Sequence, residues 1–195
     1  PLLNLDDYKE TMMNLLRDMI DSNLVQPKDY EAYFSKFLIE AKQELKKQSI
    51  ADKKKSIAKA EESKDDSKKT SYLSDTEEAD DGNEDLSLYA SLLLPFLDMN
   101  SAVEPVIQQM LRSGDKRLKY NTLLLLVEKN KPFPDTLLHY FAGMDEYRYE
   151  LYSDLKEKKK LNLFPAKYNT HLQLGHSALL GEKAYDKPDT VVFIQ

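Results

Sequence analysis

The sequence predicts an all-α fold of stacked antiparallel helical hairpins, an arrangement of the α-solenoid kind. Two observations predict it. The first is the composition, because five glycines and 32% charged residues suit helices better than a turn-rich sheet protein. The second is a pattern of asparagine, proline and an aromatic pair that occurs twice with identical spacing: Asn23, Pro27, Tyr33 and Phe34, then Asn130, Pro134, Tyr140 and Phe141. A repeated helix end followed by a proline helix start is typical of repeated hairpins.

Residues 1–50 are predicted to form an N-terminal helical hairpin. The first helix, capped by Asn4 or Asp6, should end near Asn23, and Pro27 fits the first turn of the second helix. The expected core stripe of the first helix is Tyr8, Met12, Leu15, Leu16, Met19 and Ile20. The expected stripe of the second is Tyr30, Tyr33, Phe34, Phe37, Leu38, Ala41 and Leu45.

Residues 51–85 are predicted to be a disordered charged linker, inserted between the two halves of the fold. Lysines dominate its beginning and acids its end, and its only large apolar residues are Ile57, Tyr72 and Leu73. Such a segment cannot bury enough apolar surface to offset the entropy of ordering it. We expect the preceding helix to fray into it, to about residue 60, because Lys, Glu and Ala favour helices.

Residues 86–182 are predicted to be a helical-repeat domain. A short helix from Leu86 should stop around Pro95, and the spacing of Ser101 and Glu104 predicts a capping box for the next helix. Asp115 should cap a further helix, whose stretch 118–127 is apolar nearly all round, as expected between neighbours on both sides.

Three more helices should complete this domain. One starts near Pro134 and one near Asp145, and a last helix follows Pro165 and carries Tyr168, Leu172 and Leu179. The polar stretch after it should be a connector, and the β-branched segment 190–194 reads as a strand. Residues 183–195 are therefore expected to lead from the helices into a following domain of a longer protein.

The spacing within the second half resembles a HEAT-like helical repeat. Phe133 and Pro134 recur as Phe164 and Pro165, and Tyr120 repeats the position of Tyr89 at the same interval. The resemblance covers residues 5–48 and 86–180 and implies a shape, namely a curved helical stack with a concave face. The chain is also faintly similar to helical regions of large bacterial proteins that carry a TraB/GumN hydrolase-like domain. That domain's glycine and histidine motif is not in this sequence, so the similarity implies no activity.

The composition excludes several classes of partner and site. The net charge of −6 disfavours non-specific attraction to nucleic acids or anionic membranes. Without cysteine there are no disulfides and no thiolate ligands or nucleophiles. No apolar run approaches the roughly 18 to 20 residues of a membrane-spanning helix, so no membrane insertion is expected. Nothing in the sequence distinguishes a cytoplasmic from an exported protein.

The sequence predicts no catalytic, cofactor or metal site in this segment. His171 and His176 would point about 140° apart on a helix, unlike a zinc-binding pair, and His139 stands alone. Glu104, Asp115, Asp135 and Asp145 are interpreted as helix caps or as partners of the helix dipole. A glycine-rich phosphate loop, a kinase signature and a nucleophile elbow are all missing from the sequence.

A possible interaction surface remains. It comprises a basic cluster at one interhelical turn and three tyrosines, which are enriched at interfaces: Arg112, Lys116, Arg117, Lys119, Tyr140, Tyr147 and Tyr149. The alternative for the tyrosines is a role in the core. A second basic cluster, at positions 156 and 158–160, fits the dipole of a helix C-terminus. The acidic run 75–85 is a candidate electrostatic tether for either cluster.

These patterns favour a non-catalytic helical-repeat scaffold or protein-interaction module within a larger protein. Its partners would be proteins or flanking domains of the same chain. The alternative is an accessory helical segment of a multidomain hydrolase whose active site lies outside this chain. Nucleic-acid binding is the least favoured function, because the net charge is negative.

Overall fold

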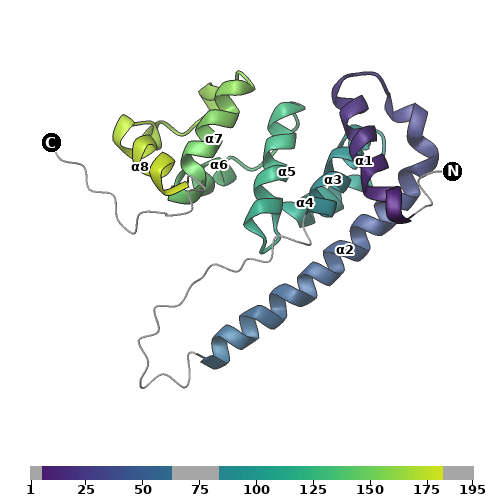
Figure 1. The fold of residues 1–195 in the computed structure, drawn as a ribbon, viewed down its shortest axis with the longest axis horizontal. Coiled ribbons are helices and arrows are strands. Elements are labelled where there is room, and N and C mark those ends of the chain that lie inside the picture. Colours follow the sequence, from purple (N-terminus) through teal and green to yellow (C-terminus); the bar gives the residue numbers. More distant parts are fainter. Residues whose placement is uncertain (1–5, 63–83, 182–195) are drawn as a thin grey trace. The chain divides into compact units, whose positions relative to one another are not determined.

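The computed structural model describes residues 6–62 and 84–181, and within these ranges the chain is helical, without strands. The α-helices are α1 (Asp6–Asp21), α2 (Pro27–Glu62), α3 (Glu84–Leu93), α4 (Val103–Leu111), α5 (Lys116–Glu128), α6 (Thr136–Ala142), α7 (Asp145–Glu157) and α8 (His171–Gly181) (Figure 1). Short 3₁₀ turns are η2 (Leu94–Phe96), η3 (Leu161–Leu163) and η4 (Ala166–Tyr168). The all-α prediction is confirmed. The predicted strand 190–194 and most of the predicted linker lie outside the described residues.

The chain forms two compact units, Pro1–Thr122 and Leu123–Gln195, with the boundary inside α5. Helices α1 and α2 belong to the same unit as α3 and α4, because α3 packs against both α1 and α2. The division expected from the sequence, into residues 1–50, 51–85, 86–182 and 183–195, stays a prediction.

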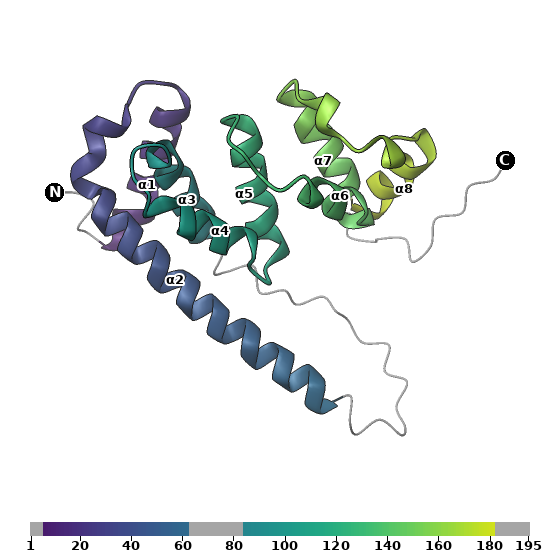
Figure 2. The same ribbon diagram turned by 180° about the vertical axis from the view of Figure 1, so that it is seen from behind.

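Helix α2 is the longest element of the first unit, with 36 residues and a length of about 54 Å. Its N-terminal part lies beside α3, whereas its C-terminal part extends beyond α3 and α4 in both views (Figures 1 and 2). Asp29 accepts a hydrogen bond from the Gln26 amide (2.8 Å), as an N-terminal capping acid does. The backbone departs from helical geometry at Tyr30, where φ is −127°.

An aromatic contact joins α2 to η2 in the core of the first unit. Phe96 meets Tyr30 edge to face and lies against Phe34, with ring centroids 5.0 and 4.7 Å apart. The Tyr30 hydroxyl donates to the Leu92 carbonyl oxygen (3.1 Å), so the phenol is buried with its polar atom satisfied. The predicted α2 stripe is largely confirmed, since Tyr30, Phe34, Phe37, Ala41 and Leu45 are all buried.

The predicted core face of α1 is wrong in part. The buried residue is Met13, which is 2% exposed, whereas Tyr8 and Leu15 are 59% and 51% exposed. Apolar side chains fill two overlapping stripes on this helix, which packs against α3, and the stripe that contains Met13 is the buried one. On α8, Leu172 and Leu179 are likewise exposed, at 57% and 46%.

Three helices end in the same left-handed turn. Asn23, Asn130 and Lys159 have φ of 56°, 53° and 57°. The residue after each donates its amide hydrogen to a carbonyl five positions back: Leu24 to Met19 (2.8 Å), Lys131 to Leu126 (2.9 Å) and Lys160 to Leu155 (2.7 Å). These bonds define the Schellman motif. The asparagines that mark the sequence pattern are therefore helix C-caps, as predicted.

The predicted cap at the N-terminus of α5 is confirmed, whereas the caps predicted for α4, α6 and α7 are not found. The Leu118 amide donates to Asp115 Oδ1 (2.9 Å), so Asp115 caps α5 as predicted. The predicted capping box of α4 is wrong, because no side chain caps this helix, and Asn100 Oδ1 accepts the Ala102 amide instead (2.9 Å). Asp135 and Asp145 do not cap their helices either.

Candidate functional site

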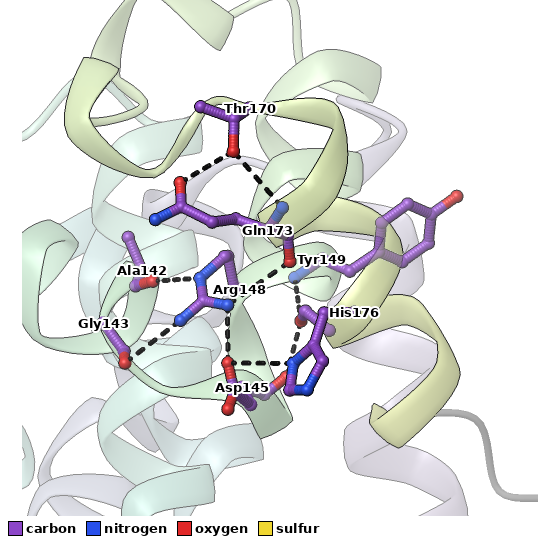
Figure 3. Close-up of polar contacts among 9 residues, drawn as sticks. Ala142, Gly143, Asp145, Arg148, Tyr149, Thr170, Gln173 and His176 are labelled. Carbon is purple, nitrogen blue, oxygen red and sulfur yellow. Dashed lines mark hydrogen bonds and ion pairs between the residues drawn. The ribbon is translucent and has the colours of Figure 1, made fainter. Parts of the chain in front are cut away.

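A polar cluster around Arg148 connects the end of α6, the start of α7 and α8 (Figure 3). Arg148 is 7% exposed, although it is a charged residue on a short helix. Its guanidinium donates to the carbonyl oxygens of Ala142 (2.8 Å), Gly143 (3.3 Å) and Gln173 (3.3 Å). One buried side chain thus satisfies carbonyl groups of both the α6–α7 turn and α8.

Asp145 balances the charge of Arg148. Its Oδ1 accepts a hydrogen bond from Arg148 Nη1 at 2.5 Å, one turn along α7, and lies 3.7 Å from His176 Nδ1. Asp145 does not cap α7, but it lies in the first turn of that helix, where the helix dipole favours an acid as the sequence suggests. The buried guanidinium holds the carboxylate, because an unpaired buried charge is more costly than an unfilled cap.

Ser177 completes the cluster from α8. Its hydroxyl donates to the Asp145 carbonyl oxygen (2.5 Å) and accepts the Tyr149 amide (2.9 Å). Serine, histidine and aspartate are the residue types of a hydrolytic triad, but Ser177 is 1% exposed and its proton points at a backbone carbonyl. Oγ is therefore neither accessible nor activated by an adjacent base, and the cluster joins α7 to α8.

The basic cluster Arg112, Lys116, Arg117 and Lys119 surrounds the α4–α5 turn. Arg112 and Arg117 are exposed, and Lys116 and Lys119 are half-buried. Three of the four cations open α5, whose first turn contains no acid. The positive end of a helix dipole disfavours cations, so helix stability does not account for this cluster. Arg117 also lies over the Tyr120 ring, 5.9 Å from its centroid.

The second basic cluster is placed differently. Lys156 lies in the last turn of α7, where the dipole favours a cation. Lys158 Nζ is 2.6 Å from Glu128 Oε2, and Lys160 pairs with Asn130. Partial burial alone would raise the pKa of Glu128, but the hydrogen bond and charge of Lys158 outweigh it, so the pKa lies below its usual value. These lysines therefore contribute to the packing of the second unit.

The three predicted tyrosines occupy different environments. Tyr147 is 8% exposed and its ring lies 5.1 Å from that of Phe141, so it belongs to the core. Tyr140 and Tyr149 are exposed at 43% and 46%. Only these two have the accessibility that an interaction surface requires.

A second charged contact joins α1, α2 and α3 in the first unit. Glu40 on α2 accepts a hydrogen bond from the Tyr89 hydroxyl (2.8 Å) and pairs with Lys9 of α1 (3.1 Å). Burial, together with Glu40, raises the pKa of Tyr89 to about 12, although Lys9 acts in the opposite direction. Burial would lower the pKa of Lys9, but its bonds to Tyr89 and Glu40 raise it.

Large apolar side chains are exposed in pairs on the first and last described helices. Tyr8 and Leu15 lie seven residues apart on α1, and Leu172 and Leu179 are likewise spaced on α8, with exposures from 46% to 59%. Residues seven apart lie on one helix face. The predicted interaction surface omits both pairs. The spacing is visible in the sequence, but only the packing shows that these faces are uncovered.

Two other kinds of feature are absent from the part of the chain that the structure describes. In residues 6–62 and 84–181 no group of histidine, aspartate and glutamate side chains has an arrangement suited to a metal ion. Across the same part of the chain, none of the helices combines the length and apolar character that crossing a bilayer requires.

The chain matches no protein-family model, no curated protein sequence and no solved structure.

Proposed function

We propose that this chain is a non-catalytic helical interaction module that binds proteins, or flanking domains of its own chain, through apolar helix faces. The single observation that carries the proposal is the exposure of the pairs Tyr8/Leu15 on α1 and Leu172/Leu179 on α8. Isolated exposed leucines are ordinary on soluble proteins. Two large apolar residues on one helix face form the pattern by which one helix docks on another protein.

The spacing of these pairs strengthens the proposal. A helix face that is in contact with water alone is normally polar. The exposed faces of α1 and α8 carry tyrosine and leucine instead. Tyr149 on α7 is a further exposed aromatic residue, and its backbone amide bonds to Ser177 of α8.

We include in this proposal a HEAT-like hairpin organisation. It is supported by the three matching Schellman helix ends and by the proline that follows two of them at the same distance, Pro27 after Asn23 and Pro134 after Asn130. Such a design supplies extended surface from short, locally packed units, which suits binding better than chemistry.

The test is site-specific photo-crosslinking of the full chain in cells. A photoreactive phenylalanine analogue replaces Tyr8 or Leu172 in the test variants, and the exposed polar residues Glu10 or Lys156 in matched controls. We expect discrete protein adducts from Tyr8 or Leu172 and none from the controls. Equal adducts at all four positions, or none at any, would refute the proposed function.

A further inference from the structure

Helix α1 carries more apolar side chains than the first unit covers. Its 16 residues include seven large apolar ones, and among residues 8–21, whose side chains the structure describes, only Met13 is buried. Helix α4 of the same unit has 9 residues, and five of them are buried. The first unit by itself therefore leaves much of the apolar surface of α1 uncovered.

The uncovered apolar side chains of α1 have the spacing of a coiled coil. Four of them are four, three and four residues apart, as the d and a positions of a heptad are, and we call them the α1 seam: Tyr8, Met12, Leu15 and Met19. Tyr8 and Leu15 are 59% and 51% exposed, and the two methionines are half-buried. At about 100° per residue the seam spans roughly 60° of the helix circumference and lies at least about 100° from Met13.

This spacing indicates another helix as the occupant of the α1 seam. Apolar residues that alternate at three and four positions let a second helix lie alongside with its side chains in the gaps. A membrane surface fits less well, because interfacial helices carry a polar face rich in lysine and arginine. Helix α1 has two cations and five acids.

The α1 seam is complementary to itself when two copies meet antiparallel. A two-fold axis between positions 13 and 14 sets Tyr8 opposite Met19 of the second copy and Met12 opposite Leu15 of the second copy. A flexible methionine then packs against a tyrosine ring or a leucine in every layer, and sulfur contacts with aromatic rings are favourable. A parallel pair would instead set each tyrosine against its own copy.

The residues beside the seam permit the antiparallel arrangement. Lys9 and Leu16 follow the seam on one side, and Thr11 and Asp18 follow it on the other. In an antiparallel pair each side meets the same side of the second copy, so Lys9 faces a leucine and Asp18 faces a threonine. No like charges are therefore brought together along the seam, where they would select against this partner.

Both charges beside the seam are already balanced within the chain. Lys9 pairs with Glu40 of α2 (3.1 Å), and Asp18 pairs with Arg17 (3.0 Å). The interface therefore needs no new ion pair and depends on apolar contact. Two chains of net charge −6 repel each other as a whole, so added salt should favour their association by screening this repulsion.

We propose that α1 binds α1 of a second copy as an antiparallel helix pair along the α1 seam. The proposal rests on the proposed function, because it names the partner of the apolar pair Tyr8/Leu15. Helix α1 is about 24 Å long, so the contact is smaller than a standard stable interface. The dimer should therefore be weak, with half of the chains associated at about 100 μM.

Sedimentation equilibrium of the full chain at increasing concentration tests the association. We expect the mass to rise from one chain toward two, and to rise further in about 0.5 M salt. Tyr8→Ser/Leu15→Ser should weaken the dimer at least about tenfold, whereas Leu172→Ser/Leu179→Ser, the matched control on α8, should leave it within about twofold. A wild-type chain that stays monomeric, or equal loss of the dimer in both variants, would overturn the proposal.

Cysteine crosslinking tests the antiparallel arrangement without removing the seam. The chain has no cysteine, so introduced thiols are the only ones present. A mixture of Met12→Cys and a mass-tagged Leu15→Cys chain should form the mixed disulfide about tenfold faster than either chain links to itself. Faster self-linking of Leu15→Cys would overturn the proposal in favour of a parallel pair.

A control pair of cysteines lies on the opposite side of α1. Glu10 and Arg17 are also related by the two-fold axis between positions 13 and 14, but they lie roughly 170° from the middle of the seam. A mixture of Glu10→Cys and Arg17→Cys should therefore link about tenfold more slowly than the seam mixture. Equal rates in the two mixtures would show random collision and overturn the proposal.

Failure of the dimer is distinguishable from failure of the proposed function. Photo-crosslinking at Tyr8 should give an adduct of two chains if the second copy is the partner. Adducts with other proteins only, from a chain that sediments as a monomer, would overturn the second copy as partner and leave the proposed function standing.

Discussion

Asn23 and Asn130 adopt the same left-handed backbone conformation, with φ of 56° and 53°, at the ends of α1 and α5. Asparagine tolerates this region better than other residues with a side chain, because its short amide bonds locally. The third such end has Lys159 in the same conformation, with φ of 57°. Lysine has no such compensation, so strain is expected there.

Replacing Lys159 by glycine should therefore stabilise the protein. We expect Lys159→Gly to raise the free energy of unfolding by about 0.5–1 kcal/mol, since glycine enters the left-handed region without steric cost. Lys156→Gly, inside the last turn of α7, should lower it by about as much. Urea denaturation followed by circular dichroism measures both, and a loss of stability at both positions would contradict the C-cap assignment.

Loss of Arg148 should loosen the contact between α7 and α8. Arg148→Met leaves the carbonyl groups of Ala142, Gly143 and Gln173 without their donor, and we expect a loss of about 2–4 kcal/mol. Hydrogen exchange should accelerate first in α8. Arg17→Met removes an exposed arginine and should cost less than about 0.5 kcal/mol, so similar losses for the two variants would argue against the cluster.

Stability should fall in strong alkali because Tyr89 loses its proton more readily in the unfolded chain. Its pKa is about 12 in the folded protein against an ordinary 10.0, so the unfolded chain releases the proton first. Stability is then complete below pH 10 and decreases as the pH rises toward 12. Tyr89→Phe should flatten this decrease and Tyr149→Phe, at an exposed site, should not. Identical slopes in denaturation curves of all three proteins would rule out this role for Tyr89.

The Glu128–Lys158 pair should make the stability of the protein fall in acid. The pKa of Glu128 lies below its ordinary value of 4.5, so its contribution is present above that pH and is lost as the pH falls through the folded-state value. Because the pair is partly exposed, we expect no more than about 1 kcal/mol. Glu128→Gln should remove this acid dependence, and Glu157→Gln should retain it. Acid titrations of unfolding that do not differ between the variants would contradict the assignment.

The sequence predicts the helix ends well, because they depend on local chemistry. Asn23, Pro27 and Asp115 each act through bonds or dihedral angles within a few residues, and each lies where its type suggests. The linker was expected to begin at residue 51, but α2 continues to Glu62. This end lies close to residue 60, to which the helix-favouring lysines and alanines were expected to extend it.

Faces and buried charges are harder to predict, because they depend on distant parts of the chain. Met13 and Leu15 are both apolar, and only the packing of α1 in the folded unit decides that Met13 is buried and Leu15 is exposed. The role of Arg148 depends on the Gln173 carbonyl, 25 residues away, which no local pattern identifies. The meeting of α2 with the α4–α5 turn is similarly invisible before folding.

In the proposed function, the apolar pairs on α1 and α8 serve binding and contribute little to folding. The most direct measurement compares wild-type full chain with Tyr8→Ser/Leu15→Ser and Leu172→Ser/Leu179→Ser, following the unfolding free energy and the proteins retained from cells by quantitative mass spectrometry. Each variant should keep its stability to within about 1 kcal/mol, because these side chains are half exposed, and should lose specific retained proteins. Stability lost by more than about 3 kcal/mol with the retained proteins unchanged would contradict the account.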